Sequence, residues 1–207
     1  MGTDETQIGH STPASPIRRR WTQTETSQWR CPVRERYDYR NCQSLFGYAQ
    51  RVHERSGAVC QLCGCGAGTQ VNFDLWRQLT VEHVVGASQG GYHAEVRTAL
   101  AGRFPDLSRN DLQQMALRID EANTVTACSF CNSTTSRHQA PKTIVQFLDE
   151  APGSPEQVVA AVVQYLGEIL LRKRRDVERK LDSVRAAFTE HVEPALREAR
   201  LQAQGNV

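Results

Sequence analysis

Glu82 and His83 stand side by side in the stretch LTVEHVVGASQGG, residues 79–91, shortly before the glycine pair Gly90-Gly91. The apolar alternation ahead of them predicts a β-strand, and neighbouring side chains on a strand point to opposite faces. One of the two polar side chains would therefore be turned toward the core, unless a site uses both. An imidazole has an unperturbed pKa near neutrality and suits a general base. The pair marks a candidate catalytic centre.

Two C-x-x-C motifs form a second group of chemically capable residues. They are Cys60-Gln-Leu-Cys63 and Cys128-Ser-Phe-Cys131. Each motif supplies two thiolates, and together they make the closed tetrahedral set that structural zinc prefers. The alternatives are a redox motif or four unconnected cysteines. A redox C-x-x-C usually stands alone at the start of a helix, so the occurrence of two such motifs favours zinc.

Three further cysteines, Cys31, Cys42 and Cys65, have no partner motif. Cys65 lies beside the first C-x-x-C and is either a competing ligand or a small, free, apolar side chain. The first residues are polar and contain no apolar run of signal-peptide length, and no stretch has the roughly 20 apolar residues of a membrane span. We therefore expect a cytoplasmic protein without membrane partners, in which structural disulfides do not form.

The chain of 207 residues has 39% hydrophobic and 7% aromatic residues and a formal net charge of +2. Such a length fits one domain of ordinary size with extensions, or two small domains. Residues 1–16 are rich in Ser, Thr and Pro and are predicted to form a disordered tail. Residues 17–44 are a basic extension in which aromatic residues are interleaved with arginines, beginning with Arg18, Arg19 and Arg20. That mixture suits nucleic acid; the alternative is a solvated extension whose aromatic side chains pack on the domain.

The elements around Glu82 and His83 follow from turn residues and periodicity. A short helix is predicted over residues 45–56, ending at Gly57. Two short strands are predicted within residues 69–85, one over VNFDLW and one over LTVEHVV.

An inserted helical stretch is predicted over residues 94–121, broken at Pro105. A strand then begins at Asn123 and leads into the second C-x-x-C, and a helix begins near Cys131 and runs toward residue 138. Two strands and a helix, with a zinc motif at each end, would make a small ββα unit.

The segments CQLCG, LTVEHVVGASQGG and NTVTACSFCN together resemble the HNH endonuclease family. The three letters of the name fall on His83, Asn123 and Asn132, where asparagine at the last position is a familiar variant. The resemblance covers residues 45–145, about half of the chain. It implies an α+β fold in which a small ββα-metal nuclease core, stapled by a four-cysteine zinc site, occupies residues 45–150.

The resemblance also implies a role for each residue. Phosphodiester hydrolysis needs an attacking water, a base and a cation that offsets charge on the phosphate. His83 would be the base, and Glu82 would be an oxygen ligand for Mg²⁺ or Mn²⁺. Asn132 would give the same metal an amide oxygen, and Asn123 would organise the loop around the histidine. The zinc would be structural, because four thiolates leave no open position for water.

The sequence departs from the family pattern in two places. Glu82 stands where Asp is commoner, and Thr135 stands where Lys or Arg is common. Arg137 or His138 would then take over the phosphate contact, and His138 is alternatively a second metal ligand or an ordinary surface histidine. His93, just after the glycine pair, is assigned a role in the loop in preference to a substrate contact.

The expected function is that of a metal-dependent HNH endonuclease that hydrolyses phosphodiester bonds in DNA, double-stranded DNA above all. A restriction or anti-phage defence setting fits a compact chain with its own extensions. One alternative is a zinc-dependent nucleic-acid-binding module without cleavage activity. Another is a mobile-element or phage nicking endonuclease.

Residues 155–203 are predicted to be mostly helical. A broad apolar face at residues 158–170 precedes the basic cluster Arg172-Lys173-Arg174-Arg175, and a narrower apolar seam runs from Val177 to Phe188. These helices either fold back over the core or form an arm that pairs two subunits, with the basic cluster along phosphates and the broad face as the interface core. A homodimer would bring two active sites to a double-strand break.

Overall fold

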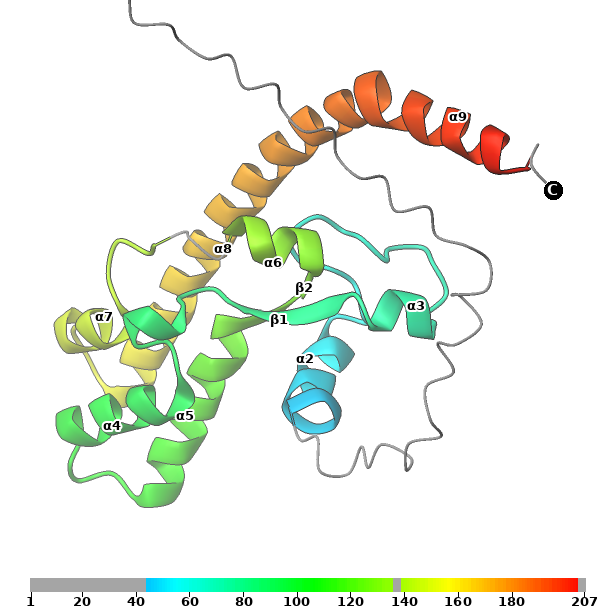
Figure 1. The fold of residues 1–207 in the computed structure, drawn as a ribbon. Coiled ribbons are helices and arrows are strands. Elements are labelled where there is room, and N and C mark those ends of the chain that lie inside the picture. Colours follow the sequence, from blue (N-terminus) through cyan, green and yellow to red (C-terminus); the bar gives the residue numbers. More distant parts are fainter. Residues whose placement is uncertain (1–43, 136–138, 205–207) are drawn as a thin grey trace, which may run out of the picture. The chain divides into compact units, whose positions relative to one another are not determined.

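The computed structural model describes residues 44–135 and 139–204 (Figure 1). The predicted tail, the basic extension up to residue 43 and its arginines lie outside the described residues, as do Cys31, Cys42, Arg137 and His138. The described part has an α+β fold made mostly of helices.

One small sheet lies at the centre of the fold. Strand β1 (Leu79–His83) pairs antiparallel with β2 (Thr124–Cys128), so that Leu79 is opposite Cys128 and His83 is opposite Thr124. Both strands were predicted, but β2 takes the place of the strand expected over VNFDLW. The pairing therefore joins residues on either side of the long insertion.

The prediction of a strand over VNFDLW is wrong. This stretch forms the one-turn helix α3 (Phe73–Trp76). The side chain of Asn72 accepts a hydrogen bond from the backbone N–H of Leu75, which satisfies one of the free donors of the first turn. A local cap of this kind outweighs the weak strand preference of a short apolar run.

The first helical segment agrees with the prediction. A π-helical turn (Ser44–Ala49) continues into α2 (Gln50–Arg55), and the chain leaves the helix through Gly57, whose φ is +60°. Only glycine adopts this conformation readily, which explains why the helix ends here.

The insertion is a pair of helices, α4 (His93–Arg103) and α5 (Arg109–Asn123), as predicted, with Pro105 in the connection between them. The hydroxyl of Ser108 accepts from the backbone N–H of Asp111 and caps α5. A short 3-10 turn (Ala87–Gln89) lies between β1 and α4.

After β2 the chain forms α6 (Ser129–Thr135), which begins slightly earlier than predicted, and then α7 (Ile144–Glu150). The long helix α8 (Pro155–Ala187) starts with a reciprocal cap between Ser154 and Gln157. A π-helical turn (Phe188–Val192) and α9 (Glu193–Gln204) follow, so the C-terminal region is helical as expected.

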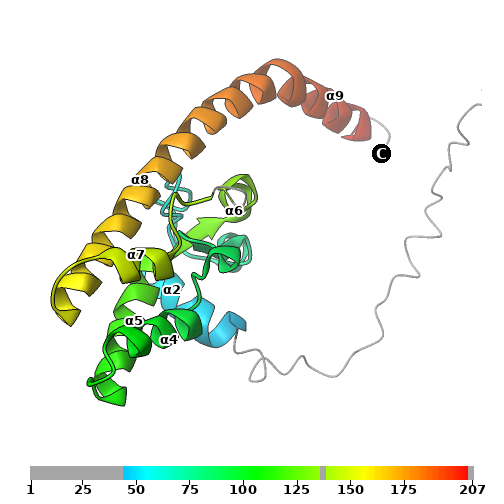
Figure 2. The ribbon, with the colours of Figure 1, turned by 90° about the vertical axis from the view of Figure 1, so that its left-hand side faces the viewer.

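The main apolar core lies between α8 and the helices of the insertion (Figure 2). The side of α8 that carries the predicted broad apolar face packs against α5 and α7 of the same chain, and α4 contributes to the same apolar cluster. Its buried side chains are Val158, Val159, Val162, Leu166 and Ile169. The expectation that this face is the core of a dimer interface is therefore wrong, because the face is already covered within one chain.

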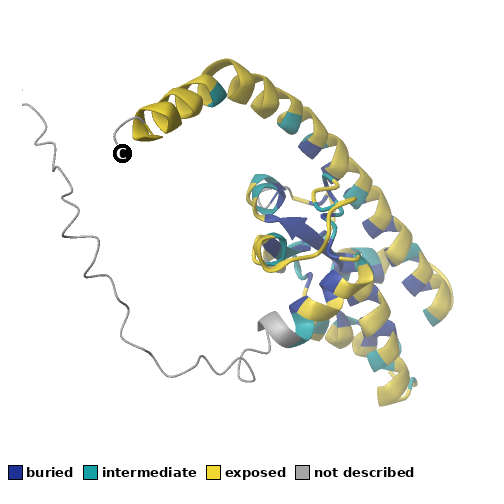
Figure 3. Ribbon diagram, turned by 90° about the vertical axis from the view of Figure 1, so that its right-hand side faces the viewer, coloured by how far each residue is buried: buried dark blue, intermediate teal, exposed yellow. Residues whose placement is uncertain are grey.

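A second, smaller cluster lies where α8 passes the sheet. It consists of Cys60, Leu62, Ala127, Cys128, Cys131 and Val177. Beyond Leu181 the helical residues are almost all exposed (Figure 3). Among the described residues, no helix is both long and apolar enough to cross a membrane.

Candidate metal centre and active site

The four cysteines of the two C-x-x-C motifs come together as predicted. One ligand atom from each of Cys60, Cys63, Cys128 and Cys131 lies within 4.8 Å of the other three. The sulfurs of Cys63 and Cys128 are 3.8 Å apart. A tetrahedron with Zn–S distances of about 2.3 Å has edges of about 3.8 Å, so the arrangement fits a metal ion such as zinc.

Because the sulfurs lie close together, the thiols affect the pKa values of one another. A hydrogen bond from the thiol of Cys131 lowers the pKa of Cys60 to about 4, and the same interaction raises the pKa of Cys131. Metal ions bind the thiolate form of cysteine, so a divalent ion at this cluster would have four thiolate ligands. Cys65 is exposed and is not one of the four, although its carbonyl accepts from the N–H of Cys60 at 2.9 Å.

The first C-x-x-C is anchored to the second strand and to α8 through Gln61. Its backbone N–H donates to the carbonyl of Thr126 at 2.8 Å, and its side-chain oxygen accepts from the N–H of Thr126 at 3.1 Å. Its carbonyl accepts from Nε of Arg174 at 2.6 Å. The metal cluster therefore sits in a frame made by β2 and α8.

His83 is the last residue of β1 and is partly exposed. Its ring meets the ring of Tyr92 edge to face, with centroids 5.4 Å apart. Burial lowers the pKa of His83, against smaller opposing effects from Asp120 and Glu82. The imidazole is therefore neutral near pH 7, which is the form that can accept a proton.

Asn123 is fully buried and holds the turn that follows His83. Its amide nitrogen donates to the carbonyls of Val85 and Gly91, at 3.1 and 2.8 Å, and its side-chain oxygen accepts from the N–H of Val85 at 2.8 Å. Its own carbonyl accepts from the N–H of Val84 at 2.8 Å. Asn123, the last residue of α5, therefore fixes the loop that follows His83.

The glycine pair is explained by the same turn. A Cβ on Gly91 would lie 2.0 Å from the carbonyl oxygen of Val85, and Gly90 has a φ of +67°. The chain needs glycine here so that it can pass close enough for Asn123 to bridge both sides of the turn.

Glu82 is buried and faces an ammonium group. Nζ of Lys173, on α8, lies 2.6 Å from Oε1 of Glu82 and donates at 3.0 Å to the carbonyl of His83. The hydroxyl of Thr135, on α6, also donates to Oε1 of Glu82, at 3.2 Å. Lys173 is only 2% exposed.

This arrangement corrects two predictions. Lys173 is not available to DNA phosphates, because its charge is used inside the protein. Glu82 does not fit the role of ligand to Mg²⁺ or Mn²⁺ in this structure, because its charge is already matched and a dication would meet the ammonium at close range.

Asn132 lies on α6, the helix that packs against both strands. It is partly exposed, and it precedes Thr135 by three residues, so the two share one face of the helix. Because Thr135 contacts Glu82, the C-terminal turn of α6 lies against the end of β1. His93, the first residue of α4, has its ring nitrogen Nε2 3.2 Å from the side chain of Gln113.

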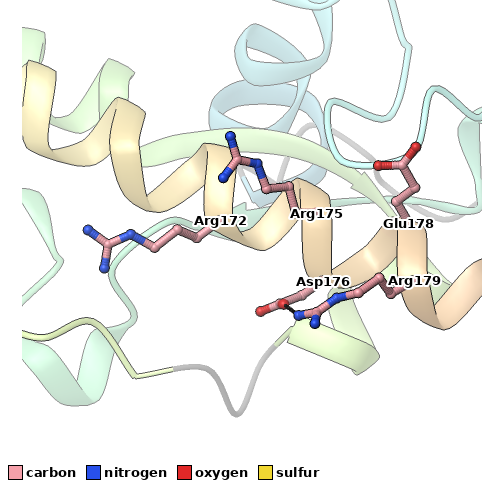
Figure 4. A pocket seen from close by; sticks show the side chains of 5 residues that line it. All are labelled: Arg172, Arg175, Asp176, Glu178 and Arg179. Atoms are coloured by element: carbon pink, nitrogen blue, oxygen red, sulfur yellow. Dashed lines mark hydrogen bonds and ion pairs between the residues drawn. The ribbon is translucent and has the colours of Figure 1, made fainter.

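The remaining arginines of the predicted basic cluster differ in their surroundings. Arg174 is held at the carbonyl of Gln61, whereas Arg172 and Arg175 point outward from α8 without an ion pair among the described residues (Figure 4). Arg179 is exposed on the same side and pairs with Asp176. The exposed basic face of α8 is therefore formed by Arg172, Arg175 and Arg179.

Sequence reasoning missed the position of Lys173, although the spacing carried a signal. The apolar positions of α8 continue from Leu166 and Ile169 to Val177 at helical intervals, and Lys173 falls on the same stripe. A lone lysine on the apolar face of a helix predicts a buried cation with an acidic partner.

The chain shows no match to any family model, any curated protein or any solved structure.

Proposed function

We propose that this chain is an HNH-type endonuclease that hydrolyses phosphodiester bonds in DNA. The observation that carries the proposal is the placement of His83 at the end of an antiparallel strand pair that packs against α6, the helix that carries Asn132, in a unit that holds four clustered cysteines. The turn after His83 is held by Asn123, so all three letters of the resemblance lie around one small unit.

In this proposal each side chain has a limited task. His83 takes the proton from the attacking water, and its neutral state near pH 7 suits that task. Asn123 holds the turn that fixes the backbone around His83. Lys173 fixes the carbonyl of His83 from the other side. Asn132 lies on the facing helix, where its amide can contact the substrate.

The Mg²⁺ or Mn²⁺ that the resemblance implies would offset charge on the phosphate and the leaving oxygen. Because Glu82 does not fit as its ligand in this arrangement, we assign no step of the reaction to a metal held by that carboxylate. The cysteine cluster would hold zinc as a structural ion.

The DNA backbone would lie along the outer face of α8, where Arg172 and Arg175 are exposed and without an acidic partner among the described residues. Replacing both with Ala should weaken binding to all DNA sequences and reduce the steepness of its salt dependence by about one unit per lost phosphate contact. Arg109→Ala, which removes an exposed arginine from the start of α5, is the matched control.

A second candidate is favoured by the Glu82–Lys173 pair: a zinc-dependent nucleic-acid-binding module without cleavage. In a protein that binds no catalytic metal, the carboxylate at this position would have a structural role, and a buried lysine that neutralises it fits that role. The two candidates share the cysteine cluster and the basic face of α8, and they differ in whether His83 acts on a substrate.

One experiment separates the candidates. Supercoiled plasmid, with and without modified bases, is incubated with the full chain and Mg²⁺ or Mn²⁺, beside His83→Ala and the control His191→Ala, which removes an exposed imidazole from the C-terminal helices. The nuclease proposal expects nicked or linear product that is lost by about 10²- to 10⁴-fold only in His83→Ala. Absence of cleavage, together with intact DNA binding, would establish the binding module instead.

The product also bears on the biological setting, which we propose to be restriction or anti-phage defence. Linear product points to double-strand cleavage, which restriction requires. Nicked product alone would favour the mobile-element or phage nicking alternative.

A further inference from the structure

The C-terminal helices carry an apolar stripe that nothing in the described part of the chain covers. Val184, Phe188, Val192 and Leu196 are 48%, 44%, 44% and 58% exposed. They follow one another on the last turns of α8, the π-helical turn and the start of α9, in the region that Figure 3 shows as exposed. We call residues 181–203 the arm.

The π-helical turn keeps these residues on one stripe. The N–H of Glu193 bonds to the carbonyl of Phe188, five residues back, so this turn contains one residue more than an α-helical turn. Successive apolar residues of the stripe are three and then four positions apart up to Phe188. Val192 follows Phe188 by four positions, and the next two intervals are four and three. With the extra residue discounted, the spacing is that of a heptad seam throughout.

The positions of this seam alternate between the two core positions of a heptad. They are Val184, Phe188, Val192, Leu196, Ala199 and Ala203, and they continue the register of Leu181, which itself packs against the smaller core cluster of the same chain. The seam is longer than the one predicted, which ended at Phe188. The π-helical turn accommodates one extra residue, so that the apolar residues after it stay on the same stripe, and the sequence alone does not indicate this turn.

The residues that border the seam on one side are charged and alternate in sign. They are Glu178, Arg185, Glu193 and Arg200, each directly after the second core position of its heptad. Such flanking charges set partner and orientation in coiled coils. Their pattern has a symmetry: Glu178 and Arg200 are equally far from residue 189, and so are Arg185 and Glu193.

We propose that the arm is the docking site for the arm of a second copy of this chain, in antiparallel orientation. Phe188 then packs against Val192 of the second copy, and Val184 packs against Leu196. Arg185 faces Glu193 of the second copy, and Glu178 faces Arg200. By twofold symmetry every one of these contacts occurs twice.

The charges distinguish this arrangement from a parallel one. In a parallel pair the residue on the other side of the seam, Lys180, would face Arg185 of the second copy, which is a repulsive contact. In the antiparallel pair both charged pairs are attractive. The charge pattern of the arm thus complements its own reverse, which identifies the occupant as another copy.

The ion pairs that the arm makes within one chain are compatible with antiparallel pairing of two arms. Arg185 contacts Asp182 at 3.2 Å, in a pair whose side chains are both mostly exposed, and Arg197, itself mostly exposed, contacts Glu193 at 2.6 Å. Exposed pairs of this kind are worth little and can exchange partners. The seam is short, so the association should be weak and dependent on protein concentration. It does not depend on the proposed nuclease activity.

The test is a charge exchange in the full-length protein, followed by sedimentation over a concentration series. Arg185→Glu and Glu193→Arg should each weaken dimerisation roughly tenfold, because each converts two attractive pairs into repulsive ones. The double variant should restore the wild-type constant. Glu198→Arg, the same change on the outer face of α9, should leave it unchanged, and Phe188→Asp should abolish the dimer while helical content stays intact.

Orientation is measured with paired spin labels, one per chain. A label at Glu190, near the symmetry centre, should lie close to its counterpart, whereas a label at Ala203 should lie far from it. A monomer at every concentration, a dimer that Phe188→Asp does not affect, or a charge exchange that does not restore association overturns the proposal. Short distances at both label positions overturn the antiparallel orientation.

Discussion

Lys173 reaches the carboxylate of Glu82 across 91 residues of sequence, from a helix to the strand that carries the candidate base. The pair is almost wholly buried and is satisfied on several sides, by Thr135 and by the carbonyl of His83. A buried ion pair of this kind adds little net stability, but removal of one partner leaves a charge without compensation.

Lys173→Met should therefore destabilise the fold by about 3–5 kcal/mol in urea unfolding of the zinc-loaded protein. The double variant Glu82→Gln with Lys173→Met should recover most of that loss, because no buried charge is left alone. Lys142→Met is the control, since the Lys142–Glu150 pair is about half exposed and should contribute less than about 1 kcal/mol. A Lys173→Met protein as stable as the wild type would show that Glu82 is not buried in solution.

His53 provides a second test at the scale of single residues. Its ring is buried, Nδ1 lies 3.0 Å from the hydroxyl of Thr126, and burial lowers its pKa below the ordinary 6.5. The unfolded chain therefore binds the proton more readily than the folded one, so this stability is fully present above about pH 6.5 and is lost as the pH falls from there through the lowered pKa of the folded protein.

His53→Gln should flatten the fall in unfolding free energy between neutral and mildly acidic pH, although His83, whose pKa is also lowered, leaves part of the slope. The measurement is urea unfolding at a series of pH values. A slope identical to that of the wild type would mean that His53 is not the group that titrates on unfolding.

At the scale of elements, the turn between β1 and α4 decides where His83 is held. Gly91→Ala would push a methyl group to 2.0 Å from the carbonyl of Val85, and the turn would have to open, with loss of the hydrogen bond from Asn123. We expect a cost of more than about 2 kcal/mol. Gly86→Ala, five residues earlier, has no atom within 4 Å of the added carbon and should be tolerated.

Thermal unfolding of the two variants checks this difference, and the cleavage assay shows whether the turn also governs activity. Equal stability of Gly91→Ala and Gly86→Ala would contradict the close approach of the backbone at residue 91.

Several elements could be predicted because their signals are local. The helices of the insertion follow from apolar periodicity and from the break at Pro105, and the two C-x-x-C motifs meet because zinc chemistry specifies both residue type and spacing. The segment at Phe73 was mispredicted because a single capping side chain, Asn72, decided between strand and helix. The partner of Glu82 was missed because tertiary packing alone brings Lys173 to it. The continuation of the seam beyond Phe188 was missed because it depends on a π-helical turn, in which the N–H of Glu193 bonds to the carbonyl of the residue five positions earlier.

At the scale of the whole molecule, two clusters share one helix. The larger core joins α8 to α4, α5 and α7, and the smaller one joins it to the cysteines. The larger core contains no cysteine and closes without the metal site.

Removal of zinc by a chelator should therefore destabilise some elements much more than others. Amide hydrogen exchange should speed up most around Cys60 and β2, and much less in α4 and α5, because metal binding supplies folding free energy only where its ligands lie. The same measurement on Cys128→Ser should reproduce the pattern, and metal analysis should find one zinc per chain. Uniform loss of protection, or protein without zinc, would contradict the separation.

The insertion between the strands has a consequence for the order of folding. β1 ends at His83 and β2 begins at Thr124, so the sheet forms only after the chain between them has closed a long loop. Helices α4 and α5 pack on each other through contacts close in sequence, which form quickly and draw the two strand ends together. We therefore expect the helical hairpin to belong to the folding nucleus and the cysteines to meet afterwards. Substitutions between α4 and α5 should slow refolding, whereas substitutions at the cysteines should mainly speed unfolding.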